Sequence, residues 1–251
     1  TLKNIIFLLL HNILLSTSVD LITKNIYIIV DVVIKIIQFK NSSNQKFKEE
    51  IVEACTDLFS CLMEKASNYI VKQYRKEINE LFFSDNFFDS TLRTLNNWAT
   101  IINLYINHEK NELIEDIFVK WNTSAGMFTS KKFETEQKCI AIKWVAFLLF
   151  ASEPDWFIDK IDSLLKKMTE NFKMTNLDKK VKIQLLLLCR VLLVRLSEEN
   201  LTDSLRKLWP NLLTELINIF EGQKDDEDGI LLLLEAFKLV ELLSLMNLED
   251  F

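Results

Sequence analysis

The scarcity of glycine and proline constrains this chain most, with three Gly and two Pro in 251 residues. Two-residue β-hairpins and phosphate-binding loops both depend on glycine, because their backbones enter conformations that other residues avoid. Gly126, Gly222 and Gly229 are too few and too scattered for either structure. Apolar residues make up 49% of the chain, enough for a sizeable core. The composition therefore predicts an all-α chain, whose helices are joined by short polar turns.

Apolar residues recur three and four positions apart along most of the chain, and polar turns interrupt this pattern. The expected helices cover residues 3–16, 18–39, 47–83, 89–106, 113–121, 130–150, 155–172, 175–196, 201–220 and 230–247. Thr129 and Ser130 are expected to cap the helix after them. Pro154 or Asp155 is expected to open the helix through residue 172. The strongest loop signal is 122–130, where the chain could subdivide.

The spacing of these helices indicates a repeat architecture. Helix pairs at 156–196 and 201–246 fit the 40–47-residue period of HEAT and armadillo repeats. The helices at 181–196 and 230–246 are apolar nearly all round, which predicts that each is sandwiched between neighbours. We expect antiparallel helical pairs stacked as an irregular HEAT/armadillo-like α-solenoid, with an irregular helical bundle as the alternative. Because the chain starts at Thr1 and lacks a polar tail after Phe251, we expect residues 1–251 to be one segment of a larger protein.

The charge pattern narrows the environment and the partners. A net charge of −6 argues against a dedicated nucleic-acid binder, whose domain would be basic. The apolar stretches 5–15 and 25–39 are too short or too charged to span a membrane, which needs about 18–20 uncharged residues. We expect both to be buried helices, and a helix lying on a membrane is the alternative.

No catalytic motif is visible in the sequence, and we expect neither enzymatic activity nor a cofactor. His11 lies on an apolar helix, whereas His108 lies in a polar turn and is expected to be exposed to solvent. No Cys-x-x-Cys motif occurs, and neither histidine is near a cysteine, which disfavours zinc. We expect buried free thiols in a reducing compartment for the four cysteines, Cys55, Cys61, Cys139 and Cys189.

An acidic loop before the last helix resembles a calcium-binding EF-hand loop only in part. Counting with Gly229 as the sixth position places Asp226 third, Asp228 fifth and Glu235 twelfth. The first position is then Lys224, a cation where a carboxylate ligand is required. The sequence therefore predicts no metal site, and instead an acidic turn that caps the next helix.

A basic cluster covers a helix end, a turn and a helix start. Its members are Lys166, Lys167, Lys173, Lys179, Lys180 and Lys182. One interpretation is a site for anionic lipid head-groups or an acidic partner. The favoured interpretation is an exposed edge between helices, because Asp162, Glu170 and Asp178 dilute the cluster. Trp98, Trp144 and Trp209 have core spacing and are expected to pack inside.

A longer motif lies in the C-terminal half. Residues 184–197 read Gln-Leu-Leu-Leu-Leu-Cys-Arg-Val-Leu-Leu-Val-Arg-Leu-Ser, with Leu-Thr at 201–202 and Leu-Trp-Pro-Asn-Leu-Leu-Thr-Glu-Leu-Ile at 208–217. This motif resembles the C-terminal region of the Dopey family, and the stretches 138–156 and 235–243 are also similar to it. The motif positions are Arg190, Arg195, Leu208, Trp209, Pro210, Thr214 and Glu215. The likeness covers about residues 135–251. An extra Ser-Leu-Arg at 204–206 lengthens the turn before the Leu-Trp-Pro, and the 223–229 loop is peculiar to this chain.

The motif residues have expected structural roles. Pro210 has no N–H and a fixed φ, so it should sit in a first turn or set a kink. Trp209 should fill the space between stacked helices. Arg190 and Arg195 lie on an apolar helix, where a buried Arg must be paired. Each is expected to bind helix-end carbonyls or an acid such as Glu215.

The resemblance implies a function. Dopey proteins are large cytosolic scaffolds attached peripherally to Golgi and endosomal membranes, where they act in vesicle and protein traffic. Their partners are a large HEAT-repeat protein related to Arf exchange factors and a type IV P-type ATPase that flips phospholipids. The resemblance supplies no catalytic or binding residue. The alternatives are an unrelated helical-repeat adaptor, cytoskeletal or nuclear, and an enzyme with an unfamiliar all-α site.

Overall fold

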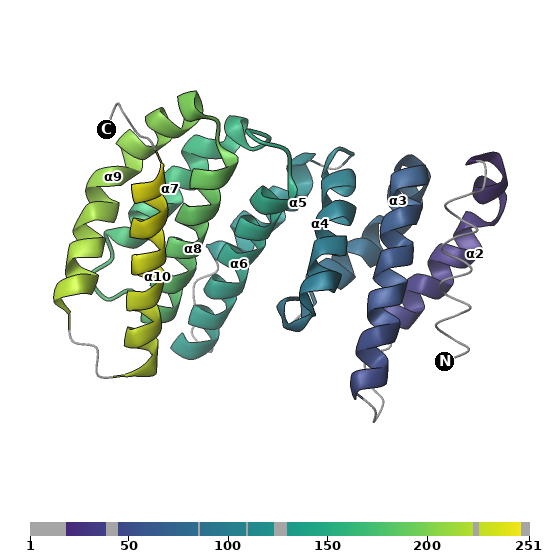
Figure 1. The fold of residues 1–251 in the computed structure, drawn as a ribbon, viewed down its shortest axis with the longest axis horizontal. Helices are drawn as coiled ribbons and strands as arrows, with labels where there is room; N and C mark the ends of the chain where they lie inside the picture. Colours follow the sequence, from purple (N-terminus) through teal and green to yellow (C-terminus); the bar gives the residue numbers. More distant parts are fainter. Residues whose placement is uncertain are drawn as a thin grey trace. The chain divides into compact units, whose positions relative to one another are not determined.

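The regular structure is entirely helical in the computed structural model, which describes residues 19–38, 45–84, 86–108, 110–122, 130–222 and 226–246. This confirms the all-α prediction. The elements, coloured along the chain in Figure 1, are α2 (Val19–Gln38), α3 (Gln45–Phe82), η1 (Phe87–Asp89), α4 (Leu92–Ile106), α5 (Lys110–Trp121), α6 (Lys131–Ala151), η2 (Ile158–Lys160), α7 (Ile161–Phe172), α8 (Lys179–Arg195), α9 (Glu198–Glu221) and α10 (Glu227–Leu245). The helix expected at 3–16 lies outside the described residues.

The chain divides into two compact units, residues 1–110 and 111–251. This division lies upstream of the 122–130 loop, most of which is outside the described residues. Helix α5 belongs to the second unit, because its side chains contact the region of η2. Glu115 pairs with Lys160 at 2.8 Å, and Phe118 packs edge-on against Phe157 with ring centroids 6.2 Å apart.

The N-terminal unit is organised around α3, which packs against both α2 and α4. Helix α3 is 38 residues long but has non-helical backbone angles at Ala66 and Tyr74, so it bends at two points. Tyr74 donates a hydrogen bond to the backbone oxygen of Tyr27 at 2.8 Å, which joins α3 to α2. The predicted helix at 47–83 therefore exists, with bends that its apolar spacing did not reveal.

The C-terminal unit is built from two layers of helices. In one layer α8 packs between α6 and α10, and in the other α7 packs against α9. Consecutive helices therefore alternate between layers, and each helix contacts the one two positions further along the chain. This is the arrangement of stacked antiparallel helical pairs that the sequence predicted.

Several polar contacts between neighbouring repeats share one register. Ion pairs join residues 45 positions apart at Glu115–Lys160, Asp162–Lys207 and Arg190–Glu235. Lys167 also donates a hydrogen bond to Asn122, again 45 positions away, at 2.7 Å. Equivalent residues of successive pairs thus lie side by side, and the spacing agrees with the expected 40–47-residue period.

The two helices expected to be apolar nearly all round differ in burial. Helix α8 is covered on both sides, as predicted. Helix α10 packs against α8 and α9, and much of its opposite face is exposed among the described residues. The prediction that the 230–246 helix is sandwiched was therefore wrong, because α8 and α9 leave its opposite face exposed among the described residues.

Side-chain caps precede α4, α6, α8 and α10. Ser130 caps α6, as predicted, and its oxygen accepts a hydrogen bond from the backbone N–H of Phe133 at 3.2 Å. Asp178 and Asp226 cap α8 and α10 in the same way. Helix α4 starts after its cap Thr91 rather than at residue 89, because the 3₁₀ turn η1 occupies 87–89. Each cap satisfies N–H groups that have no partner within the helix.

Helix α7 starts later than predicted. Residues 154–157 form a turn and 158–160 a 3₁₀ helix, so α7 begins at Ile161 rather than at Pro154 or Asp155. Asp155 has φ of 57°, in the left-handed region. Its N–H donates to the backbone oxygen of Arg195 at 3.1 Å, and its carboxylate accepts from the N–H of Ser197 at 2.9 Å. Contacts with the α8–α9 turn therefore divert the chain from the helix that Pro154 could have opened.

Helix α9 includes two segments that were expected to be turns. The separator predicted at 198–200 forms its first turn, with acidic side chains that suit a helix N-terminus. The extra residues 204–206 are helical too, and Ser204 and Leu205 are buried, so they lengthen the helix rather than a turn. Pro210 lies inside α9, not in a first turn.

No helix among the described residues has the length and apolar character needed to cross a membrane. Helix α2, which contains most of the second apolar stretch, carries an ion pair between Lys35 and Asp31 at 2.7 Å. The first apolar stretch, 5–15, lies outside the described residues.

Candidate functional site

The Leu-Trp-Pro motif lies at the middle of α9. Leu208 is buried, Trp209 is only half-buried and Pro210 is exposed. The hydroxyl of Thr214 donates to the backbone oxygen of Pro210 at 2.8 Å, one helical turn away. The motif thus supplies one side chain to the core and leaves Pro210 and Thr214 on the surface. Of the three tryptophans expected inside, Trp98 and Trp144 are buried, and Trp209 is at the edge.

Arg195 joins the end of α8 to the end of α6. Its guanidinium donates a hydrogen bond to the backbone oxygen of Ser152, the C-cap residue of α6. The last carbonyls of a helix have no intrahelical partner, so a cation there satisfies an acceptor and complements the helix dipole. With the two hydrogen bonds of Asp155, this contact joins the α6–α7 turn to the α8–α9 turn.

Arg190 reaches forward from α8 to α10. It forms an ion pair with Glu235, whose other carboxylate oxygen binds Lys238 at 2.7 Å. The side chains of Arg190 and Glu235 are mostly buried, which weakens screening by water. The acid that pairs with Arg190 is therefore Glu235 of the next repeat, and not Glu215.

Glu215 pairs instead with Lys182. The Lys182 nitrogen lies 2.7 Å from a Glu215 oxygen, between the start of α8 and the second half of α9. Glu215 is 5% exposed, so this contact lies inside the stack. Removal of either partner would leave an uncompensated charge in a poorly solvated place.

The six lysines of the basic cluster do not act as one surface. Lys179, Lys180 and Lys182 pair with Asp226, Asp228 and Glu215 respectively. Lys167 donates to Asn122 and lies 5.1 Å from the centre of the Phe118 ring, and its partial burial lowers the pKa of its ammonium. Lys166 and Lys173 are exposed. Half of the cluster therefore holds α8 to α9 and α10.

The acidic loop caps the last helix, as predicted. Asp226 accepts a hydrogen bond from the N–H of Gly229 at 2.7 Å and pairs with Lys179 at 2.8 Å. These two contacts hold the pKa of the Asp226 carboxyl below its ordinary value. Asp228 and Glu235 point to cations of α8, and within the described residues no cluster of acids, histidines or cysteines could hold a metal ion.

The four cysteines are free thiols. Cys55 and Cys189 are buried, and desolvation raises the pKa of each thiol to about 12. Cys61 and Cys139 are partly exposed, and burial also raises the pKa of Cys139 to about 11. Such thiols are poor nucleophiles at neutral pH. His108 is exposed and lies 3.2 Å from the Ser67 hydroxyl, whereas His11 is outside the described residues.

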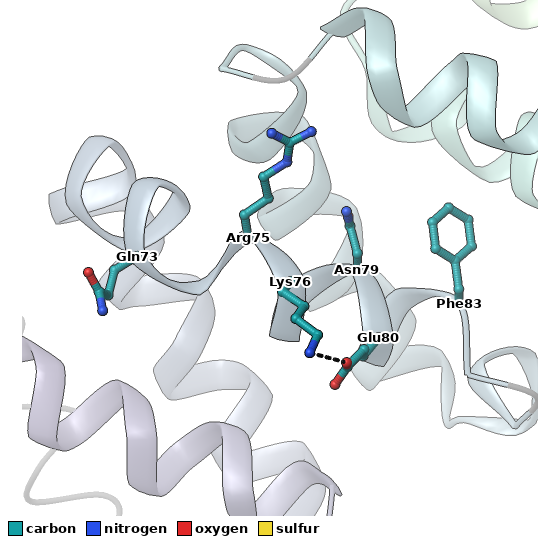
Figure 2. A pocket seen from close by; sticks show the side chains of 6 residues that line it. All are labelled: Gln73, Arg75, Lys76, Asn79, Glu80 and Phe83. Carbon is teal, nitrogen blue, oxygen red and sulfur yellow. Dashed lines mark ion pairs between the residues drawn. The ribbon is translucent and has the colours of Figure 1, made fainter.

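Two hollows lined by the described residues do not bring an acid and a base together. An open hollow of about 550 Å³ lies along α3. Among its lining residues, Arg75, Asn79 and Phe83 point to one side (Figure 2). Lys76 and Glu80 form an ion pair at its border, with 3.7 Å between the charged atoms. A second hollow of about 280 Å³, between α2, α3 and α4, also has Glu80 as the single carboxylate in its lining. One acid paired with a lysine cannot supply both an acid and a base.

Sequence comparisons identify the family. The family model described as DOP1 C-terminal matches residues 2–251. The chain belongs to the DOP1, or Dopey, family. The match includes residues 2–134, where the sequence motifs gave no resemblance.

Curated DOP1 relatives are much longer than the matched region. Protein DOP1B of Mus musculus is 30% identical over 158 residues, which is 63% of this chain and 6% of the mouse protein. Protein DOP1B of Xenopus laevis is 28% identical with the same coverage, and Protein DOP1 of Saccharomyces cerevisiae is 27% identical over 193 residues, 72% of this chain and 11% of the yeast protein. No solved structure matches the chain.

The charged contacts between repeats were not found from the sequence. Glu235, Lys207 and Glu115 carry no local signal, since each looks like an ordinary surface residue of an amphipathic helix. The signal that could have found them is a comparison of charges 45 positions apart, where opposite signs recur.

Proposed function

We propose that this DOP1 chain is part of a non-catalytic scaffold in membrane traffic between the Golgi and endosomes. It holds protein partners on the surface of its stacked helices. The partners are a large HEAT-repeat protein related to Arf exchange factors and a type IV P-type ATPase that flips phospholipids. The protein resides in the cytoplasm, peripherally on Golgi and endosomal membranes.

The observation that carries this proposal is the family match across residues 2–251, together with the resemblance in the Leu-Trp-Pro region. Stacked helical pairs suit such a role, because they offer long continuous surfaces that small domains lack. The match also removes the alternative of a helical-repeat adaptor unrelated to the family.

The chemistry of the described residues favours a scaffold over an enzyme. Hydrogen bonds lower the pKa of two described carboxyls, those of the half-buried Asp155 and the exposed Asp226. A general acid would need a pKa raised toward neutrality in a cleft. The buried ion pairs join helices to each other and do not converge on a cavity.

Affinity purification of the endogenous protein from its own cells, with mass spectrometry of the bound proteins, tests the proposal. We expect the HEAT-repeat protein and the flippase to co-purify, and a version that lacks residues 2–251 shows whether this region is needed. Recovery of cytoskeletal or nuclear proteins in place of both partners would contradict the proposed role.

A further inference from the structure

An apolar face remains open on the last two helices. On α10 it contains Ile230, Leu234 and Phe237, which are spaced four and three residues apart and so share one side of the helix. On α9 it contains Leu213 and Ile217. These five side chains are 42% to 59% exposed, unlike the buried residues on the opposite sides of both helices.

The two stripes form one continuous surface. Phe220 lies three residues after Ile217 on the same side of α9, and its ring packs edge-on against Phe237 of α10 with centroids 5.2 Å apart. The aromatic pair therefore connects the α9 stripe to the α10 stripe. An open apolar surface with an aromatic centre is typical of protein-binding sites.

Charge distinguishes this surface from an ordinary core face. Glu227 and Glu241 lie in line with the α10 stripe, three residues before Ile230 and four after Phe237, and the exposed Leu245 follows one turn after Glu241. Both glutamates are exposed, and within the described residues neither pairs with a cation. The carboxylates are 14 positions apart, so they lie about 21 Å from each other along the helix.

We propose that this face binds an amphipathic helix with a basic residue near each end of its apolar stripe. A helix fits because α8 already accepts the apolar side of α10 in the same layer, so a further helix against the exposed side of α10 would repeat that packing. The spacing of the two carboxylates sets the length of the partner helix, since basic residues about 21 Å apart are separated by about four helical turns. The inference rests on the proposed scaffold function and assigns a surface and a partner chemistry to it.

The acidic ends disfavour other occupants. An anionic lipid surface would repel Glu227 and Glu241, since membrane-lying helices carry Lys and Arg beside their apolar side. A second copy of the same face would place carboxylates near carboxylates. A basic amphipathic helix, by contrast, gains both apolar burial and ion pairs.

Two synthetic peptides test the proposal by fluorescence anisotropy with the 251-residue chain. Each is about 18 residues long, about five helical turns, with the same leucine stripe. One peptide has lysines at both ends of the stripe, and the other has glutamates. We expect the lysine peptide to bind about tenfold more tightly at low salt, and the difference to shrink as salt screens the charges.

Matched variants locate the binding. Leu234→Asp should weaken the lysine peptide by at least about tenfold, because it places a charge in the apolar contact. Leu92→Asp, an exposed leucine of α4 in the other unit, is the control and should leave binding unchanged. The double variant E227K/E241K should reverse the preference toward the glutamate peptide, which a fold defect would not do.

Several results would overturn the inference. Equal binding of both peptides, or equal effects of Leu234→Asp and Leu92→Asp, would show that the face does not select a basic helix. Self-association of the chain, or binding to phosphatidylserine vesicles, that Leu234→Asp abolishes would assign the face to another occupant. If the traffic partners co-purify with the endogenous protein while the peptides fail, the scaffold function stands and only this face is refuted.

Discussion

Helices α8 and α10 have similar sequences and different environments. Both are rich in leucine nearly all round, and both belong to the same layer of the C-terminal unit. Leu186 of α8 is fully buried between neighbours, whereas Leu234 of α10 is 47% exposed. Apolar character all round therefore indicates that a helix can be covered on two sides, while its neighbours decide whether it is.

Thiol accessibility gives the largest contrast between the two helices. In a background with Cys61 and Cys139 replaced by serine, Leu234→Cys should react with a thiol reagent about a thousandfold faster than Cys189, whose exposure requires unfolding. Burial also raises the pKa of Cys189 to about 12, which lowers its thiolate fraction. Mass spectrometry of labelled peptides with time measures both rates. Comparable rates would mean that α8 is as open as α10.

Truncation of one leucine in each helix is the next test. Leu186→Ala should lower the free energy of unfolding by about 2–5 kcal/mol, because it removes contacts and leaves a cavity. Leu234→Ala should change it by no more than about 0.5 kcal/mol, since the side chain is largely solvated. Urea unfolding measured by tryptophan fluorescence compares the two variants. Equal losses of unfolding free energy in the two variants would contradict the exposure of Leu234 on α10.

The ion pair between the two helices should have a smaller effect. A double-mutant cycle with Arg190→Ala and Glu235→Ala should give a coupling of about 1–2 kcal/mol, because the pair is mostly shielded from water. Arg206→Ala in α9 is the control, because Arg206 and Asp203 form an exposed pair with 4.0 Å between the charged atoms. We expect a coupling of less than about 0.5 kcal/mol between Arg206 and Asp203. A coupling no larger than the control would show that Arg190 does not hold α10.

The smallest effect concerns the cap of α10. Lys179 and the Gly229 N–H hold the pKa of Asp226 below its ordinary 3.8 in the folded chain. The stabilisation is therefore complete above about pH 5 and is lost as the pH falls through the lowered folded pKa. Asp226→Asn should reduce this dependence of the urea midpoint between about pH 5 and pH 3. Asp203→Asn, on the exposed side of α9, should retain it.

Much of the local structure could be predicted from the sequence. Ser130 and the acidic loop at Asp226 were expected at helix starts, and each is there, because a cap depends on residues within one turn. The all-α class and the 40–47-residue spacing were also predictable. Scarce glycine and proline and the positions of apolar residues determine both.

Only the tertiary structure decided which residues meet. The partner of Arg190 is Glu235 and not Glu215, and Asp155 turns the chain away from a helix that Pro154 could open. The tertiary structure also decided that one side of α10 is exposed. These outcomes depend on side chains about 40 or more positions apart, or on whether another helix is present. A local pattern specifies a helix and its apolar sides, but burial and pairing are properties of the stack, because each needs a second surface that the helix itself does not encode.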